Sequence, residues 1–296
     1  MYELITRLSR KFKLIGVSRR LDSNIGNIEF RFVPNIPKIG ILYYELVPFF
    51  MRGKFDIFWG TNHVIPHTII KNPTVVTIHD LIPYKYPSDD SLSSLQRLRV
   101  YSSINRASRI VCVSETTAND VLDIFGRKLE KKISVIKPGV SVISRELLYK
   151  LKESFRPIVR RLESSVFFLV PGAHRPRKNL PLAVSAFELL KLRSKEDIYL
   201  VITGELHTDY KSLIKGKEYI ITTGPLDREE VLYLMSKSIA VLYPSLYEGF
   251  GSPKLEAMAL GVPVLALDIQ INREIGGEGI ILLKDNPEEW AEVMHV

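Results

Sequence analysis

Residues 243 to 266 read Tyr-Pro-Ser-Leu-Tyr-Glu-Gly-Phe-Gly-Ser-Pro-Lys-Leu-Glu-Ala-Met-Ala-Leu-Gly-Val-Pro-Val-Leu-Ala. An apolar run from Ile239 to Tyr243 leads into this stretch and ends in a turn, as a buried parallel strand does. Gly249 and Gly251 bracket a loop whose backbone can come close to a ligand, because neither residue carries a Cβ. The stretch therefore predicts a strand, a glycine loop, a helix, a turn and a second strand.

The helix after the loop has clear start and stop signals. Ser252 is expected to be the N-cap, and Pro253 the first helical residue, where its missing N–H costs nothing. Gly261 is expected to end the helix. One face carries apolar side chains and is predicted to pack in the core: Leu255, Met258 and Ala259.

Two carboxylates accompany the loop, Glu248 just before it and Glu256 on the helix. A carboxylate buried among apolar neighbours costs several kcal/mol unless it has partners. Sugar hydroxyls suit Glu256, because they donate hydrogen bonds and carry no charge, and the free N–H groups of the first helical turn would attract a phosphate. A glycine loop alone would indicate only a capped helix with one satisfied glutamate. The loop together with both glutamates favours a binding site.

The segment from Tyr247 to Ala266 resembles the E-x7-E signature of retaining glycosyltransferases of family 4, which have the GT-B fold. The resemblance implies an α/β protein with two Rossmann-like parallel-sheet domains facing each other across a cleft. It also implies that Glu248 faces the donor sugar and phosphate and that Glu256 holds the ribose hydroxyls of the nucleotide. The donor-binding residues implied are Gly172, Arg177, Lys178, Glu248, Gly249, Phe250, Gly251, Ser252 and Glu256.

A cluster of cations follows the predicted strand Val166 to Val170 and precedes a helix, which is a favourable place for an anion. A surface turn with solvated charges is the alternative. The sequence Pro-Arg-Lys-Asn-Leu at 176–180 resembles the family's diphosphate clamp, which implies that Arg177 and Lys178 bind phosphate and have a catalytic role with Glu248. The segment 224–230 resembles the one that borders the nucleobase.

His79 and Asp80 directly follow the predicted strand Thr74 to Ile78, at the strand end where such sheets bind ligands. A histidine there is often only a cap. The context resembles the His-Asp segment of family 4 mannosyl- and rhamnosyltransferase-type enzymes, which implies a catalytic His79 beside the donor sugar. Asp80 either steadies the loop or touches an acceptor hydroxyl.

The order of strands and helices predicts two domains. Short buried strands alternate with helices along the whole chain, which indicates parallel sheets covered on both faces. A chain of 296 residues, 46% hydrophobic and 25% charged, can build two cores. We place the boundary near Glu163, between an acceptor-side domain at 1–163, which includes a helical connector at 145–162, and a nucleotide-sugar-binding domain at 164–296.

The net charge of +8 is concentrated at the N-terminus and in the connector. A solvated face and the anionic inner surface of a membrane remain equal alternatives, while nucleic acid ranks last because no nucleic-acid motif accompanies the charge. The run from Ile39 to Met51 is predicted as an aromatic amphipathic helix that packs in the core or meets a lipid acceptor. The single cysteine, Cys112, and the lack of a signal-peptide or membrane-span pattern favour the cytoplasm.

Metal and cofactor signals are weak. His63 and His67 have a suggestive spacing, but Pro66 opposes the helix that would align them, and no third ligand stands out. No Asp-x-Asp motif occurs in the chain. We therefore expect no metal and no cofactor, with the charge of the leaving diphosphate balanced by cations and a helix N-terminus.

The residues and the resemblance together predict a metal-independent glycosyltransferase that moves a hexose from a nucleotide-diphosphate sugar to a glycan or lipid-linked acceptor, and the resemblance implies that it is a retaining enzyme. GDP-mannose is the first expectation for the donor and a UDP-sugar the second. Compared with the family pattern, a first strand with its glycine-rich loop and the last helices are missing, which keeps a catalytically silent partner subunit as an alternative. An epimerase of the same fold ranks third. A nicotinamide dehydrogenase is disfavoured, because Gly249 and Gly251 lack the third glycine of that fingerprint.

Overall fold

The structure, a computed structural model, describes residues 6–18, 29–32, 45, 55–68, 72–87, 94–140, 144–172 and 175–295. The chain divides into two compact units: Met1–Leu81 with Leu92–Pro138, and Ile82–Ser91 with Gly139–Val296. Each unit holds a parallel sheet, which agrees with the predicted α/β class. Among the described residues, no helix combines the length and the apolar character needed to cross a membrane.

The first unit is built on a four-stranded sheet in the order β3-β4-β5-β6, with every neighbouring pair parallel. The strands are β3 (Phe58–Gly60), β4 (Thr74–Ile78), β5 (Arg109–Cys112) and β6 (Ile133–Val135). A separate parallel pair is formed by β1 (Ile15–Ser18) and β2 (Glu29–Phe32). The predicted strand at 74–78 is confirmed at both ends.

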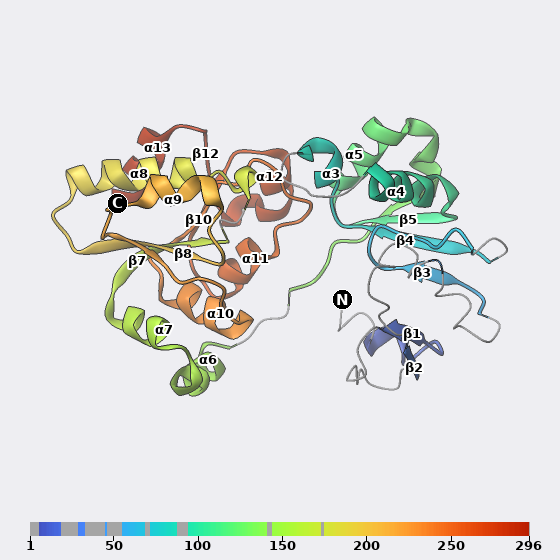
Figure 1. Ribbon diagram of the computed structural model, residues 1–296, viewed down its shortest axis with the longest axis horizontal. Helices are drawn as coiled ribbons and strands as arrows, with labels where there is room; N and C mark the ends of the chain where they lie inside the picture. The colour runs from blue at the N-terminus through green and yellow to red at the C-terminus, as the bar shows by residue number, and fades with distance from the viewer. Residues whose placement is uncertain are drawn as a thin grey trace. The chain divides into compact units, whose positions relative to one another are not determined.

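Two helices of the first unit flank strand β5 in the sequence. α4 (Ser94–Arg106) precedes β5, and α5 (Glu115–Phe125) follows it (Figure 1). The Ser114 side chain accepts the N–H of Thr117 and caps α5, which ends at Gly126 with φ 101°. Cys112 is fully buried, and burial, followed by the charge of Glu115, raises the pKa of its thiol to about 12.

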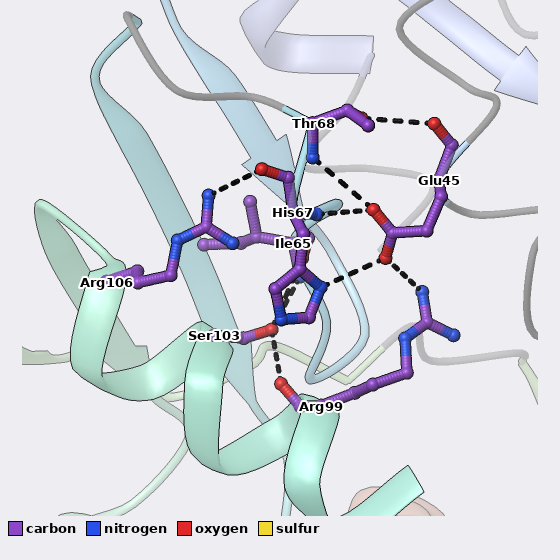
Figure 2. Close-up of polar contacts among 7 residues, drawn as sticks. All are labelled: Glu45, Ile65, His67, Thr68, Arg99, Ser103 and Arg106. Atoms are coloured by element: carbon purple, nitrogen blue, oxygen red, sulfur yellow. Dashed lines mark hydrogen bonds and ion pairs between the residues drawn. The ribbon is translucent and has the colours of Figure 1, made fainter. Parts of the chain in front are cut away.

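A polar cluster holds the loop after β3 to α4 within the first unit (Figure 2). The Glu45 carboxylate accepts hydrogen bonds from the backbone N–H of His67 at 2.6 Å and from the Arg99 guanidinium at 2.9 Å. Burial raises the pKa of Glu45, but the bonds from His67 and Arg99 outweigh it and leave the pKa below its ordinary value. The predicted helix at 39–51 otherwise lies outside the described residues.

The second unit is built on a six-stranded, all-parallel sheet in the order β12-β11-β10-β7-β8-β9. The strands are β7 (Val166–Pro171), β8 (Ile198–Thr203), β9 (Ile220–Thr222), β10 (Val241–Tyr243), β11 (Val264–Leu267) and β12 (Ile281–Leu283). The chain starts at the centre with β7, runs outward to β9, and returns to the centre with β10. This is the doubly wound order of Rossmann-like domains, and its direction reverses between β7 and β10.

Helices cover both faces of this sheet, because successive strand residues point to opposite sides. Phe168, Val170 and Leu200 pack in one core with α8 (Leu180–Arg193) and α13 (Pro287–His295). The intervening strand residues pack in a second core with α10 (Arg228–Lys237) and α11 (Ser252–Ala259) (Figure 1). Shorter helices complete the unit: α3 (Ile82–Lys85), α9 (Lys211–Ile214) and α12 (Gln270–Gly276).

The predicted helical connector is broken into short pieces and packs with the second unit. α6 (Arg145–Leu151) and α7 (Pro157–Arg161) are separated by a 3-10 turn, and their apolar residues join the α10 and α11 core. Pro157 explains the break, because a proline opens a new helix more readily than it continues one. The domain boundary near Glu163 stays a prediction, although the compact unit itself begins before the connector.

Candidate functional site

The central feature of the second unit is a buried carboxylate between two cations. Oε1 of Glu248 lies 2.6 Å from Nζ of Lys178 and 3.0 Å from Nη1 of Arg177. Glu248 is 8% exposed, and the two cationic side chains are 10% and 11% exposed. Arg177 also donates to the carbonyl of Tyr247 at 3.0 Å. Three residues predicted to bind the donor are thus brought together by the fold.

The sheet topology explains why these side chains meet. The segment with Arg177 and Lys178 follows the carboxyl end of β7, and the segment with Glu248 follows β10, the neighbouring strand at which the winding reverses. A backbone hydrogen bond from Leu246 N–H to the Arg177 carbonyl, at 2.8 Å, joins the two segments. Ligands of doubly wound sheets bind at this switch point.

The electrostatics of Glu248 favour the ionised carboxylate. Burial alone raises its pKa, but the charges of Lys178 and then Arg177 outweigh burial and hold the pKa below the ordinary value. The site therefore contains a fixed anion, with two cations that can also face an incoming phosphate.

The glycine loop and helix α11 follow Glu248. Gly251 has φ +84°, the left-handed region that favours glycine, and it occupies the N-cap position. The prediction that Ser252 is the N-cap is therefore wrong by one residue: Ser252 is the first helical residue and is exposed. The other loop residues are buried: Phe250 is 8% exposed, and Gly249 is buried as well.

The buried face of α11 also differs from the predicted one. Lys254 and Ala257 are buried in the helix, whereas Ala259, predicted to be in the core, is exposed. Lys254 is 0% exposed, and its ammonium donates to Oδ1 of Asn272 on α12 at 2.6 Å. Sequence reasoning missed Lys254 and Asn272 as buried residues, because lysine and asparagine side chains are usually exposed and nothing local indicates otherwise.

Glu256 lies on α11 with its side chain 16% exposed, so the expected partial burial is observed. Its partner is Arg228 at the start of α10, whose Nη2 lies 2.7 Å and Nε 3.2 Å from Oε1 of Glu256. Sequence reasoning did not single out Arg228, although it lies in the segment 224–230 matched to the nucleobase border. The capping box of Asp227 and Glu230 fixes the start of α10 and so the position of Arg228.

Gly172 and Asn179, on either side of the cationic segment 176–178, both have left-handed backbone conformations. Gly172 follows β7 with φ +75°, and its N–H bonds to the Thr203 carbonyl at 3.1 Å. Asn179 adopts φ 51° and turns the chain from the 3-10 helix Pro176–Lys178 into α8. These two turns keep the cations at the end of the sheet and away from the helix surface.

His79 and Asp80 lie in the first unit, directly after β4, as predicted. Nε2 of His79 lies 2.8 Å from the carbonyl oxygen of Thr61, and its ring centroid lies 5.6 Å from that of His63. His63 has φ 60°, an uncommon conformation for a residue other than glycine, and sequence reasoning considered it only as a metal ligand. Both side chains are half-buried at the end of the sheet.

In the part of the chain that the structure describes, no three His, Cys, Asp or Glu side chains are grouped so that they could hold a metal ion. His63 and His67 have different surroundings, since Nδ1 of His67 contacts Glu45 at 3.1 Å. The described residues place two cations, a buried carboxylate and a helix N-terminus at this end of the sheet.

Two family models together match nearly the whole chain. The model described as "Glycosyltransferase Family 4" matches residues 2–142, and "Glycosyl transferases group 1" matches residues 152–295. The boundary between the matches falls in the connector.

Curated relatives are similar at modest identity. The O-antigen chain mannosyltransferase RfbU of Salmonella typhimurium is 29% identical over 250 residues, covering 82% of this chain and 65% of the relative. O-antigen chain mannosyltransferase B of Escherichia coli is 24% identical over 244 residues, covering 79% of this chain and 62% of the relative. The chain spans less than two thirds of the length of these relatives.

Solved structures share the fold. The complex of Anabaena Alr3699/HepE with UDP and glucose has a TM-score of 0.70 and 17% identity, covering 99% of this chain and 84% of that one. WaaG, a glycosyltransferase involved in lipopolysaccharide biosynthesis, has the same TM-score and identity, covering 100% and 84%. With the two parallel sheets, the likeness shows the GT-B fold, and the chain belongs to the group 1, family 4 glycosyltransferases.

Proposed function

We propose that this chain binds a nucleotide-diphosphate sugar in its second unit and transfers a hexose, with retention of configuration and without a metal, to a glycan or lipid-linked acceptor. The observation that carries this proposal is the buried Glu248 carboxylate held between Arg177 and Lys178 at the switch point of a doubly wound sheet. Buried, preorganised charges of this kind are suited to balancing charge that develops during a reaction.

Transfer of the sugar requires cleavage of its bond to the diphosphate of the donor. Breaking the bond between the sugar and the diphosphate leaves negative charge on the phosphate oxygens. Arg177 and Lys178 would take up that charge, and the first N–H groups of α11 would add their dipole. Glu248 would face the sugar, where its anionic charge favours the positive character of the transition state. The family resemblance implies retention by front-face attack of the acceptor, and we assign no residue of this chain as an enzymic nucleophile.

For the nucleotide, we propose that Glu256 holds the ribose hydroxyls. A carboxylate accepts two hydroxyl donors well, and the Arg228 guanidinium, with its Nη2 2.7 Å from Oε1, already orients the Glu256 carboxylate. Gly172, Gly249, Phe250, Gly251 and Ser252 complete the proposed donor site, because their backbone approaches the same strand ends.

GDP-mannose is the proposed first donor and a UDP-sugar the second. The first choice is supported by the mannosyltransferase relatives, and the second by the UDP complex of the structural neighbour. His79 would act beside the transferred sugar, and Asp80 would steady the loop or contact an acceptor hydroxyl. The glycan acceptor is supported by the same O-antigen relatives.

The experiment that tests the function is transfer of labelled mannose or glucose from GDP-mannose or UDP-glucose to a glycan or lipid-linked acceptor, with a metal chelator present. Labelled product that persists in chelator, with the anomeric configuration of the donor, supports the proposal. Binding of the nucleotide sugar without transfer to any acceptor would contradict it and would indicate a silent sugar-nucleotide-binding subunit.

A further inference from the structure

Lys254 is a fully buried lysine beside the proposed donor site, and neither the motif nor the proposed mechanism uses it. It is the third residue of α11, and its ammonium donates to the neutral amide oxygen of Asn272 at 2.6 Å. Asn272 is itself 0% exposed and is held by its own hydrogen bond to the Leu267 carbonyl at 2.8 Å. The lysine is therefore fixed in one position by a rigid partner.

The ammonium of Lys254 lies directly behind the glycine loop. A Cβ built on Gly251 would lie 2.8 Å from both Cε and Nζ of Lys254, and 3.2 Å from the hydroxyl of Tyr243. Nζ of Lys254 also lies 5.5 Å from the centroid of the Tyr243 ring, and Nζ of Lys178 lies 5.3 Å from it. Lys254, behind the glycine loop, and Lys178, in the segment 176–178, thus both lie near the ring of Tyr243.

The Tyr243 hydroxyl adds a second observation. Tyr243 is 2% exposed, and its hydroxyl forms no hydrogen bond of normal geometry within the described residues, although the Glu248 carboxylate is close enough to interact with it. Burial and the charge of Glu248 raise its pKa well above the ordinary value, so the phenol stays neutral. A buried, unsatisfied hydroxyl next to a glycine loop is consistent with a site completed by a ligand or by water.

Charge in this region is unbalanced. Arg177, Lys178 and Lys254 are opposed by Glu248, and Glu274 on α12 is the other carboxylate whose charge acts on Lys254. Of these five described residues, three are cationic and two are anionic. A diphosphate at the loop would reverse this imbalance.

A purely structural role explains Lys254 poorly. Burying an ammonium costs several kcal/mol, and an apolar side chain of the same length would fill the space at less cost. Asn272 supplies a hydrogen bond but no opposite charge. A destabilising charge retained at a ligand site is typical of residues that serve function at the expense of stability.

We propose that Lys254 is a positioning residue of the donor site: its buried charge supports the glycine loop from behind and attracts the donor diphosphate without touching it, so donor affinity depends on its protonation. This inference rests on the proposed function. Burial lowers the pKa of Lys254 to about 8, against the opposing effects of Glu248 and Glu274, while Lys178 lowers it further. The charge is therefore lost within an accessible pH range.

The test measures the Kd of GDP-mannose and UDP-glucose by calorimetry between about pH 6.5 and 9, where their diphosphate does not titrate. In the parent chain, affinity should be constant below about pH 8 and weaken above it, because the bound diphosphate favours protonated Lys254. Lys254→Met should bind about tenfold more weakly near pH 7, with affinity independent of pH. Its Tm should equal or exceed that of the parent, because a buried charge whose direct partner is a neutral amide is removed.

A second variant keeps the test decisive if Lys254→Met folds poorly. Asn272→Asp is isosteric and places a carboxylate beside the ammonium, which should move the inflection of affinity upward by about one pH unit or more. A pH-independent Kd in the parent chain, or an inflection unmoved in Asn272→Asp, overturns the role of Lys254 and leaves the proposed function standing. Absence of nucleotide-sugar binding by the parent chain at every pH overturns the proposed function itself, and the inference with it.

Discussion

Nζ of Lys178 lies 2.6 Å from Oε1 of Glu248, although the two residues are 70 positions apart in the chain. The contact joins the ends of β7 and β10, the neighbouring strands at which the sheet reverses its winding. The Glu248 carboxylate forms ion pairs with both cations proposed to bind the diphosphate. The same pair therefore links the stability of the site to its proposed chemistry.

Glu248→Gln should separate binding from transfer. The amide keeps the shape but removes the anion, so Arg177 and Lys178 lose their opposite charge and become freer to bind phosphate. We expect GDP or UDP to bind at least as tightly as to the parent chain, while transfer falls about 100-fold. Calorimetry and a transfer assay measure the two effects. Equal transfer by the variant and the parent would contradict the role of Glu248 at the sugar.

The same variant should be less stable by about 1–3 kcal/mol, because the buried cations remain without their anion. A double-mutant cycle with Lys178→Met isolates the pair. Additive losses in free energy of unfolding would show that the two side chains do not interact in solution.

Glu256→Ala should weaken nucleotide binding about tenfold, because the proposed hydrogen bonds to the ribose are lost. Arg228→Ala is the control for its ion pair: Arg228 is 46% exposed, so the surface pair should contribute less than about 1 kcal/mol to stability. A 2′,3′-dideoxynucleotide provides the matching ligand. The Glu256→Ala loss should disappear with that ligand, and an unchanged loss would place Glu256 away from the ribose.

Gly251→Ala should be more harmful than Gly216→Ala, although both glycines have similar positive φ angles, +84° and +76°. At Gly216 nothing lies within 4 Å of an added Cβ, so the cost is backbone strain of about 1 kcal/mol. At Gly251 the added methyl would also displace Lys254. Thermal unfolding compares the two variants, and equal losses of stability would show that the loop tolerates a side chain.

His79→Ala should slow transfer and leave nucleotide affinity unchanged, because His79 belongs to the first unit and is proposed to act on the transferred sugar. We expect a loss of about 100-fold in kcat with little change in donor Kd. Asp80→Asn is the matched control at the next position, and it should affect the KM for the acceptor or nothing. A His79→Ala variant that transfers normally would make this histidine a cap of the Thr61 loop.

Much of the fold could be predicted, because parallel strands leave a strong signal. The strand at 74–78 was predicted at its exact bounds, and the alternation of strands and helices gave the α/β class. The glycine loop with its two glutamates led to the family, which the comparisons established. Apolar runs and glycines at positive φ are local features, so a single sequence reveals them.

The features that could not be predicted depend on the rotation of a helix about its axis and on partners that are far apart in the sequence. A helix turns about 100° per residue, so the rotation of α11 about its axis decides that Lys254 is buried and Ala259 exposed, and the local sequence does not set that rotation. Arg228 reaches Glu256 across 28 positions, and no spacing rule reports such a pair. The core that the connector joins was likewise hidden, since Leu148 and Val159 pack with residues far along the chain.

The most direct measurement is thermal unfolding of the parent chain, and of a Lys178→Met, Glu256→Ala double variant, against a panel of nucleoside diphosphates and nucleotide sugars. A ligand at 100 times its Kd adds about 2.7 kcal/mol to the stability of the folded state. The account predicts a selective rise in Tm of the parent with GDP or UDP compounds, and little or none in the double variant. No rise in the parent with any nucleotide, or an equal rise in both chains, would contradict a donor site at the end of β7 and β10.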